Sequence, residues 1–506
     1  MIWASSESLM LRPWVLRIIL RRDSAASVHR QITHAVIEEI RAGRLAPGSA
    51  LPGSRKLAES LKVNRKTVVQ AYDELVAQGW LAADSTRATF VPSQLPQLPN
   101  VEQGVRAPRQ TRPSGKIADA PDFRLRRRAP AIAYMPRADG VLAFDDGSPD
   151  TRLMPVDALA RAYRRALLEA GRGNRLGYGD PRGSEKLRSA VSTMLNLDRG
   201  LSCAPDNICI VRGSQMGIYV AARILIEPGD VAVMEQLSYP PAREAFRAAG
   251  AEIAIVDLDS QGMRLDQLEA LCRRKRVRAV YVTPHHQFPT TVVLRPERRL
   301  YLMMLAEQFG FAIVEDDYDH EFHFDHRPML PLASADRGRK VVYIGSMSKV
   351  LSPSLRMGYM HAPVPVIDRA AAEVMMIDRQ GDPAGEDAVA EMMGAGVIKR
   401  HTRKVLRIYA ERRALLGALL RDAFGSDIAF LLSPGGLALW VHFDESIDMG
   451  RLADAGARNF VSFLPGSIFA MTDAPVQAAR LGFGSMNPDE LGEAVERLRA
   501  ARRLIA

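Results

Sequence analysis

Residues 341–359 read Val-Val-Tyr-Ile-Gly-Ser-Met-Ser-Lys-Val-Leu-Ser-Pro-Ser-Leu-Arg-Met-Gly-Tyr. The β-branched and aromatic start predicts a buried strand that delivers Lys349 into a site. Small polar residues such as Ser346 leave room for a large ligand near the amine, and Arg356 offers a planar fork suited to phosphate. This combination suits an aldehyde cofactor that also carries a phosphate. Taken alone, however, the stretch favours a solvated lysine on a loop, which is what most lysines are.

A second apolar run, Phe311–Val314, stops at Glu-Asp-Asp-Tyr-Asp, residues 315–319. Carboxylates at the C-terminal end of a strand are well placed for a site in an open α/β sheet. An acid opposite a pyridine nitrogen keeps that nitrogen protonated, and a tyrosine hydroxyl can bond the phenolic oxygen of the ring. The alternatives are a solvated acidic turn and a metal-binding cluster, although no matching set of oxygen ligands appears elsewhere.

Together, the two runs resemble fold type I pyridoxal-phosphate (PLP) enzymes of the aspartate aminotransferase superfamily. Ile-Gly-Ser-Met-Ser-Lys with an arginine seven residues later, and Glu-Asp-Asp-Tyr-Asp, are similar to the MocR subfamily of GntR transcription regulators in particular. The resemblance implies an α/β protein in which a winged helix-turn-helix is fused to an aminotransferase-like domain with a mostly parallel sheet. It also implies a PLP Schiff base on Lys349, with cofactor contacts from Asp316, Tyr318, Ser346 and Arg356.

The positive charge of the chain is concentrated near its N-terminus. Residues 1–140 contain 22 Lys and Arg against 12 Asp and Glu, a surplus that equals the whole formal net charge of +10. This asymmetry suggests a polyanion partner for the N-terminal part alone. At 506 residues the chain is also too long for one core.

The sequence offers no sign of export or of a membrane partner. Three cysteines lack any Cys-x-x-Cys spacing, which favours a reducing compartment without disulfides. Arg12 and Arg17 interrupt the apolar start, and no small-residue cleavage site follows it, so residues 1–20 are neither a convincing signal peptide nor a span. We therefore expect a cytoplasmic protein.

The N-terminal region has the pattern of a helix-turn-helix. Apolar residues at helical spacing predict a helix over Val28–Arg41, and Ser54 and Asn64 are expected to cap two further helices over 55–61 and 65–77. Trp80-Leu81 and residues 88–91 are expected to form two strands of a wing. The residues predicted to contact DNA phosphates or base edges are Ser54, Arg55, Asn64, Arg65, Lys66, Thr67, Gln70 and, in the wing, Arg87.

The order of short motifs along residues 28–91 resembles that of the GntR winged helix throughout. These motifs include Gly-Arg-Leu-x-Pro-Gly, Leu-Pro-x-Ser-Arg-x-Leu-Ala and Asn-Arg-x-Thr-Val. The tip of the wing departs from the family, because residues 84–88 replace its usual glycine-rich turn. A small helical bundle with a solvated, mildly basic face is the alternative, which we rank below DNA binding.

The expected organisation is an N-terminal tail (1–24), a winged helix-turn-helix (25–92), a linker (93–138) rich in Pro, Gln and Arg, and an effector domain (139–506). Arginines of the linker can contact DNA or keep the segment soluble, and we favour solubility. In the effector domain, helical patterns alternate with short β-branched runs, which predicts a mostly parallel sheet. These runs are 208–211, 231–234, 253–256, 279–282, 313–314 and 341–344.

The aminotransferase resemblance covers residues 141–485 and implies three further contacts. Ser214 and Gln215 fall where a helix N-terminus holds the cofactor phosphate. Tyr239 matches the ring that stacks on the pyridine. Arg480 matches the arginine that pairs with a substrate carboxylate, and here it is expected to bind the effector.

The chain departs from the family at three places. Thr283-Pro-His-His-Gln-Phe-Pro-Thr resembles the subfamily's Thr-Pro-Ser-His-Gln-Phe-Pro-Thr-Gly, but Thr291 replaces the glycine, and Phe288 replaces the asparagine of true aminotransferases, which weakens the case for catalysis. Subfamily members that sense an ω-amino acid have a second arginine where this chain has Pro241. We expect no metal site, because no nearby Cys or His completes a set with His285 and its neighbour His286.

Two main hypotheses follow. The preferred one is a homodimeric, PLP-dependent regulator that binds operator DNA and senses an amine or amino acid, controlling either amino-compound catabolism or PLP metabolism. Physiological turnover is not expected of it, although weak transaminase activity is compatible with its residues. The rival is an active aminotransferase with an appended helix-turn-helix domain. A GntR regulator with a cofactor-free domain is a third, less favoured possibility.

Overall fold

The protein was analysed as a computed structural model, which describes residues 18–21, 26–84, 89–95, 139–324, 329–336 and 339–505. The chain divides into two compact units, which meet in sequence at residues 124 and 125. Most of the predicted tail and linker lies outside the described residues, as do Arg87 and the linker arginines. The predicted domain boundaries therefore stay predictions.

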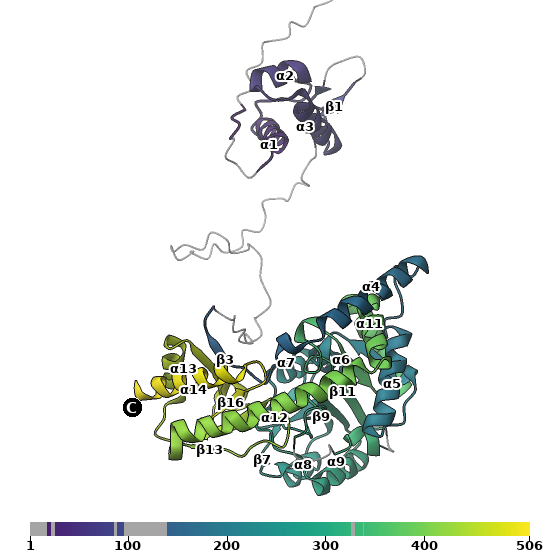
Figure 1. The fold of residues 1–506 in the computed structure, drawn as a ribbon. Coiled ribbons are helices and arrows are strands. Elements are labelled where there is room, and N and C mark those ends of the chain that lie inside the picture. The colour runs from purple at the N-terminus through teal and green to yellow at the C-terminus, as the bar shows by residue number, and fades with distance from the viewer. Residues whose placement is uncertain are drawn as a thin grey trace, which may run out of the picture. The chain divides into compact units, whose positions relative to one another are not determined.

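The N-terminal unit is a three-helix fold with a small wing (Figure 1). The first and third helices pack their apolar faces together through Ile32, Val36, Val68 and Leu75, all of them fully buried. A short strand-like segment pairs with the wing, because Leu51 N donates to Thr89 O. The elements are α1 (Val28–Arg41), α2 (Ser54–Leu61), α3 (Arg65–Ala77), β1 (Ala82–Ala83) and β2 (Thr89–Phe90).

Two local expectations for this unit were wrong. Ser54 is the first residue of α2 rather than its cap, and the capping position is taken by Gly53. The first wing strand begins at Ala82, after Trp80 and Leu81, because Leu81 turns into the core and is 2% exposed. Asn64 does cap α3, since its side-chain oxygen accepts a 2.9 Å hydrogen bond from Lys66 N.

The C-terminal unit is built on a seven-stranded sheet in the order β4-β12-β11-β10-β9-β5-β6. All its strands run parallel except β12, which pairs antiparallel with both neighbours. The six predicted runs all form strands of this sheet, whereas β12 was not predicted. The strands are β4 (Ile208–Val211), β5 (Val231–Glu235), β6 (Glu252–Val256), β9 (Val277–Val282), β10 (Ala312–Asp317), β11 (Val341–Ser346) and β12 (Gly358–His361).

Helices cover both faces of this sheet, because consecutive strand residues point to opposite sides. In β10, for example, Ile313 belongs to the core under α5, α9 and α11, and Val314 belongs to the core under α6, α7 and α10. The helices of the unit are α4 (Val156–Arg172), α5 (Glu185–Arg199), α6 (Gly213–Leu225), α7 (Pro240–Ala249), α8 (Leu265–Cys272), α9 (Pro296–Phe309), α10 (Val364–Asp378), α11 (Pro383–Gly394), α12 (Val397–Phe424), α13 (Met449–Arg458) and α14 (Pro488–Arg503).

A second, five-stranded sheet has the order β13-β14-β16-β15-β3 and packs against α12, α13 and α14. The long helix α12 runs from this smaller sheet towards the large one (Figure 1). The remaining strands are β3 (Leu142–Phe144), β13 (Ile428–Ala429), β14 (Ala438–Phe443), β15 (Val461–Pro465), β16 (Ala478–Gly482) and the hairpin β7 (Leu258–Asp259) with β8 (Gly262–Met263).

Two expectations drawn from composition can be compared with the structure. The three cysteines, Cys203, Cys209 and Cys272, are all free. None of the helices in the described ranges combines the length and the apolar character that a membrane crossing requires.

Candidate functional site

The predicted site residues gather where the parallel strands of the large sheet end. Ser214 follows β4, Tyr239 follows β5, Asp316 is the penultimate residue of β10, and Lys349 follows β11. Because the carboxyl ends of parallel strands meet at one edge of a sheet, four segments far apart in sequence supply this edge. Strand β10 continues through Asp317, so residues 315–317 form its C-terminal end, and Tyr318 and Asp319 follow it.

Asp316 is the buried carboxylate at the centre of this edge. Its Oδ2 accepts a 2.8 Å hydrogen bond from the Tyr281 hydroxyl, while its Oδ1 has no partner. Burial raises the pKa of Asp316 to about 7, and the hydrogen bond from Tyr281 opposes the shift. A buried acceptor without a donor is costly, and a protonated pyridine nitrogen supplies the missing donor. The site therefore fits the ring of PLP at this position.

Lys349 and Tyr239 both interact electrostatically with Asp316. Lys349 lies half-buried in the turn after β11, and its charge lowers the pKa of Asp316. Burial raises the pKa of Tyr239, the charge of Asp316 raises it further, and the charge of Arg356 opposes both effects. Tyr239 is thus coupled to the predicted ring-binding acid and to the predicted phosphate-binding arginine.

The start of α6 and Arg356 form a cradle for an anion. Gly213, the first residue of α6, has φ +78°, and a Cβ at this position would lie 2.8 Å from Nη2 of Arg356. The guanidinium also donates a 2.8 Å hydrogen bond to the carbonyl of Arg212, which fixes it against the helix N-terminus. Backbone N–H groups and an arginine fork at one place are the donors that a phosphate requires. Glycine is needed here both for its conformation and for the close approach.

Three further predicted cofactor contacts, Ser214, Gln215 and Ser346, have less support from the structure. Ser214 is half-buried and Gln215 is exposed in the first turn of α6. Ser346 is buried at the end of β11, where its Oγ accepts a 3.1 Å hydrogen bond from Ser348 N. The roles of these three residues stay predictions.

Phe288 lies among the other site residues. Its ring centroid is 5.1 Å from that of Tyr239 and 5.9 Å from that of Tyr318. The guanidinium carbon of Arg480 lies over the same ring, 4.6 Å from its centroid. An apolar ring therefore stands where aminotransferases place an asparagine, and no amide is available at this position to bond a ligand.

Arg480 is the most deeply buried of the predicted ligand-binding residues, with 1% of its surface exposed. It lies on β16 and donates to the carbonyls of Asp146, at 2.8 Å, and Pro289, at 2.7 Å. Within the described ranges, no carboxylate forms an ion pair with it. Buried charges are normally paired, so an arginine held in this way is suited to a carboxylate supplied by a ligand.

Tyr318 belongs to the acidic run at the end of β10 and also contacts Arg480. Its hydroxyl donates a 3.0 Å hydrogen bond to the carbonyl of His286, so in this structure its proton is already used. Burial raises the pKa of Tyr318 well above its usual value, and Arg480 opposes the shift through its charge and a hydrogen bond. The predicted contact of Tyr318 with a phenolic oxygen stays a prediction.

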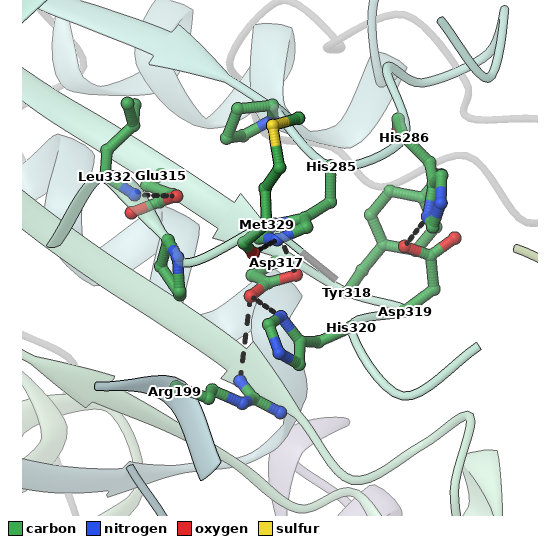
Figure 2. A network of polar contacts seen from close by, with 12 residues as sticks. Arg199, His285, His286, Glu315, Asp317, Tyr318, Asp319, His320, Met329 and Leu332 are labelled. Carbon is green, nitrogen blue, oxygen red and sulfur yellow. Dashed lines mark hydrogen bonds and ion pairs between the residues drawn. The ribbon is translucent and has the colours of Figure 1, made fainter. Parts of the chain in front are cut away.

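The other acids of the run have separate roles (Figure 2). Glu315 accepts hydrogen bonds from Leu332 N, at 2.8 Å, and Ala333 N, so it holds a neighbouring segment. Asp317 accepts from Nδ1 of His320, at 2.8 Å, and lies 3.4 Å from Nδ1 of His285. We expected no further Cys or His near enough to complete a set with His285, and that expectation was wrong, because the fold brings His320 and His323 beside it.

The predicted DNA-contacting residues that the structure describes lie on α2, on α3 and at the N-terminal cap of α3. Arg55, Arg65, Lys66 and Gln70 are exposed, and none of the three cationic side chains pairs with an acid of the described part of the chain. Asn64 is exposed too, but its side-chain oxygen is engaged in the cap of α3. Ser54 and Thr67 are half-buried, and the Oγ of Ser54 accepts a 3.4 Å hydrogen bond from Arg65 Nε.

Comparison with known proteins gives the same two-part organisation. Residues 29–91 match the gntR family of bacterial regulatory proteins, and residues 140–498 match the aminotransferase class I and II family. Over 487 residues the chain is 30% identical to the probable rhizopine catabolism regulatory protein MocR of Rhizobium meliloti, a match that covers 96% of this chain and 95% of that protein. The chain belongs to the MocR subfamily of GntR transcription regulators.

A second relative supports regulation over the rival hypothesis of an active aminotransferase. This MocR-type chain is 30% identical over 502 residues to the HTH-type transcriptional regulator TauR of Rhodobacter capsulatus, with coverage of 94% and 97%. Both regulators match along nearly their whole length, including the DNA-binding unit. The protein is therefore a helix-turn-helix transcription regulator with an aminotransferase-like domain.

Solved structures resemble the C-terminal unit of the MocR-type chain. LysN, an α-aminoadipate aminotransferase from Thermus thermophilus complexed with N-(5'-phosphopyridoxyl)-L-leucine, has a TM-score of 0.68, 26% identity and coverage of 72% of this chain and 93% of its own. The kynurenine aminotransferase of Pyrococcus horikoshii, with a TM-score of 0.67 and 25% identity, covers 72% and 91%. The C-terminal domain thus has the aminotransferase fold, whose enzymes depend on PLP.

Proposed function

We propose that this MocR-type regulator binds PLP at Lys349 and changes its binding to operator DNA when a primary amine with one carboxylate enters the site. The observation that carries the proposal is Arg480, which is buried beside the cofactor site without an acidic partner in the described residues. A ligand carboxylate would supply the paired charge that this arginine lacks.

Each part of the site has a separate task in this proposal. PLP, when bound, supplies an aldehyde that reacts with primary amines and a pyridine ring that withdraws electrons. Lys349 holds the cofactor through its ε-amine, Asp316 orients the ring through Oδ1, and Arg356 with the start of α6 binds the phosphate. The amine of an effector competes with Lys349 for the same aldehyde, and Arg480 selects effectors that carry a carboxylate.

Contacts of Arg243 support an effector with a single acidic group. In sequence, Arg243 is the cation nearest to Pro241, which occupies the position where ω-amino-acid sensors have a second arginine. Its Nε donates to Glu244, at 2.9 Å, and its Nη1 donates to the carbonyl of Ala470, at 3.0 Å. Since Arg243 is already paired, it is not available to a second carboxylate.

We further propose a cytoplasmic homodimer that regulates amino-compound catabolism, with regulation of PLP metabolism as the second option. The first option is supported by the relative named for rhizopine catabolism. The exposed cations of α3 are suited to phosphates of DNA, and neutralising several phosphates gives the strong salt dependence expected of such binding.

Absorbance and DNA binding test this function together. Purified protein with PLP should show the absorbance of a lysine-bound cofactor and should bind a promoter-upstream fragment in fluorescence anisotropy. Lys349→Ala should lose that absorbance while still binding DNA, and amino acids should change the DNA affinity of the parent protein only. Steady transamination at about 1 per second or faster without DNA binding would contradict the proposal.

A further inference from the structure

Three histidines gather beside the cofactor edge without any role in the function proposed above. His285, His320 and His323 each offer a ring nitrogen, and these nitrogens lie within 4.8 Å of one another. His285 and His320 are 3% and 6% exposed, and His323 is half-buried. Their rings meet edge to face, with centroids 4.7 Å apart for His285 and His320. Packing of aromatic rings is the simplest explanation of such a cluster. A further role for the histidines therefore depends on whether their ring nitrogens are free of hydrogen-bond partners.

The hydrogen bonds determine which nitrogen each ring can offer. His285 uses Nε2 against the carbonyl of Met329, so its Nδ1 carries the free lone pair and has no partner in its buried position. His320 uses Nδ1 against Oδ2 of Asp317, at 2.8 Å, which leaves Nε2 (Figure 2). Nε2 of His323 is buried and unpartnered. Each ring therefore offers at least one free nitrogen.

Asp317 adds a further unsatisfied atom. Its Oδ1 has no hydrogen-bond donor and lies 3.4 Å from the free Nδ1 of His285. When a neutral His285 donates from Nε2, its Nδ1 is an acceptor. This nitrogen then faces a second acceptor, Oδ1 of Asp317. A cation beside these atoms would satisfy them together.

We propose that His285, His320 and His323 bind a divalent first-row transition metal ion, for which Zn²⁺ is the best chemical fit. Imidazole nitrogens suit this ion, and about 2.0–2.1 Å is the usual Zn–N distance. Tetrahedral geometry then needs ligand nitrogens about 3.4 Å apart, so nitrogens that lie up to 4.8 Å apart must approach each other by up to about 1.4 Å on binding. Asp317 holds His320 through its second ring nitrogen, which is how carboxylates commonly support metal-ligating histidines.

The surroundings give the ion a route and an open coordination position. A cavity of about 1010 Å³ is lined by His285 and His323, together with His286, Met329, Trp440 and His442 among others. An ion with three protein ligands keeps a fourth position for water or a small ligand from this cavity. The site is next to the cofactor edge, because Asp317 follows Asp316, but it uses none of the residues assigned to PLP.

Co²⁺ provides a spectroscopic probe that PLP absorbance does not obscure. Tag-free, full-length protein treated with a chelator should bind one Co²⁺ per chain and develop the visible d–d bands of tetrahedral nitrogen ligation, and one equivalent of Zn²⁺ should remove those bands. This measurement needs no variant. Absence of the bands in the parent protein would overturn the proposal and leave ring packing as the role of the cluster.

Variants then assign the ligands. His285→Ala, His320→Ala and His323→Ala should each weaken Zn²⁺ binding about 100-fold in competition with a chelator, and Asp317→Asn should weaken it about 10-fold to 100-fold. The control, His442→Ala, removes a histidine that lines the same cavity but is not in the cluster, and should bind Zn²⁺ like the parent. Melting temperature and PLP absorbance identify variants that fail to fold. Zn²⁺ affinity unchanged in folded variants of all three histidines would place the ion elsewhere and refute the site.

Discussion

The Tyr281 hydroxyl donates a 2.8 Å hydrogen bond to Oδ2 of Asp316 and leaves Oδ1 of that buried carboxylate without a partner. The two residues lie on neighbouring parallel strands, β9 and β10. One oxygen is thus fixed by the protein, and the other is kept for a ligand. Tyr281 was not predicted from the sequence, where it is one aromatic residue in an apolar run.

Tyr281→Phe should weaken PLP binding about 10-fold, because a hydrogen bond to a charged group contributes about 1.5–3 kcal/mol. The lost bond also favours the protonated acid, which cannot hold the pyridine nitrogen in its charged form. Absorbance titration with PLP measures the affinity. Tyr301→Phe is the control, since Tyr301 bonds Glu269 away from the site. Equal affinities for the two variants would contradict the role of Tyr281.

Gly213→Ala should lower PLP affinity strongly, because the new Cβ would lie 2.8–3.0 Å from the guanidinium of Arg356 and displace it from the cradle. The matched control is Gly229→Ala. Gly229 also has a positive φ, +95°, but nothing lies within 4 Å of its added Cβ. Both variants should lose about 1 kcal/mol or more of stability through backbone strain, and only the first should lose the cofactor. Retention of normal PLP affinity by Gly213→Ala would rule out the cradle.

Arg480→Lys should weaken the response to amino acids about 100-fold, while simple amines without a carboxylate should act as on the parent protein. Lysine keeps the charge but cannot offer the bidentate fork. The shift of PLP absorbance with effector concentration measures both responses. Arg412→Lys serves as control, because Arg412 is also buried but already pairs with Asp150 at 2.9 Å. Arg480 is not the effector ligand if amines and amino acids lose affinity equally.

Arg65→Ala and Lys66→Ala should each weaken DNA binding and reduce the slope of log affinity against log salt by about 1, as expected for one lost phosphate contact. Fluorescence anisotropy at several salt concentrations gives the slope. Arg44→Ala should change neither quantity, since Arg44 is paired with Glu39 at 2.7 Å. An unchanged slope in both α3 variants would remove the N-terminal end of this helix from the DNA interface.

Glu235→Gln should make the stability of the folded protein less sensitive to rising pH. Burial raises the pKa of Glu235 from 4.5 to about 7, and the hydrogen bond from Gln287 opposes the shift. The folded state therefore keeps a proton that the unfolded state releases, so the parent loses stability as the pH rises from about 4.5 to about 7. Glutamine retains an acceptor for Gln287 but does not titrate. Between pH 5 and pH 8, the free energy of unfolding of the variant should rise by about 1–3 kcal/mol relative to that of the parent. Denaturant unfolding at several pH values measures both free energies. A difference that stays constant with pH would exclude Glu235 as the titrating group.

Local patterns predicted the strands, the helix-turn-helix and the residues at strand ends, because each depends on a few consecutive residues. They did not predict β12, since Gly358–His361 is short and follows directly on the cofactor-binding stretch. Contacts set by the register of neighbouring strands, such as Tyr281 with Asp316, have no local signal. The histidine cluster was missed for the same reason, because His285 is separated from His320 by a helix and a strand.

The first strand described in the effector domain belongs to the same sheet as Arg480. Leu142–Phe144 forms β3, which pairs with β15, and β15 pairs in turn with β16, the strand of Arg480. Arg480 and β3 thus belong to one hydrogen-bonded sheet. A shift of Arg480 on binding of the proposed effector would therefore reach β3 through two strand pairings.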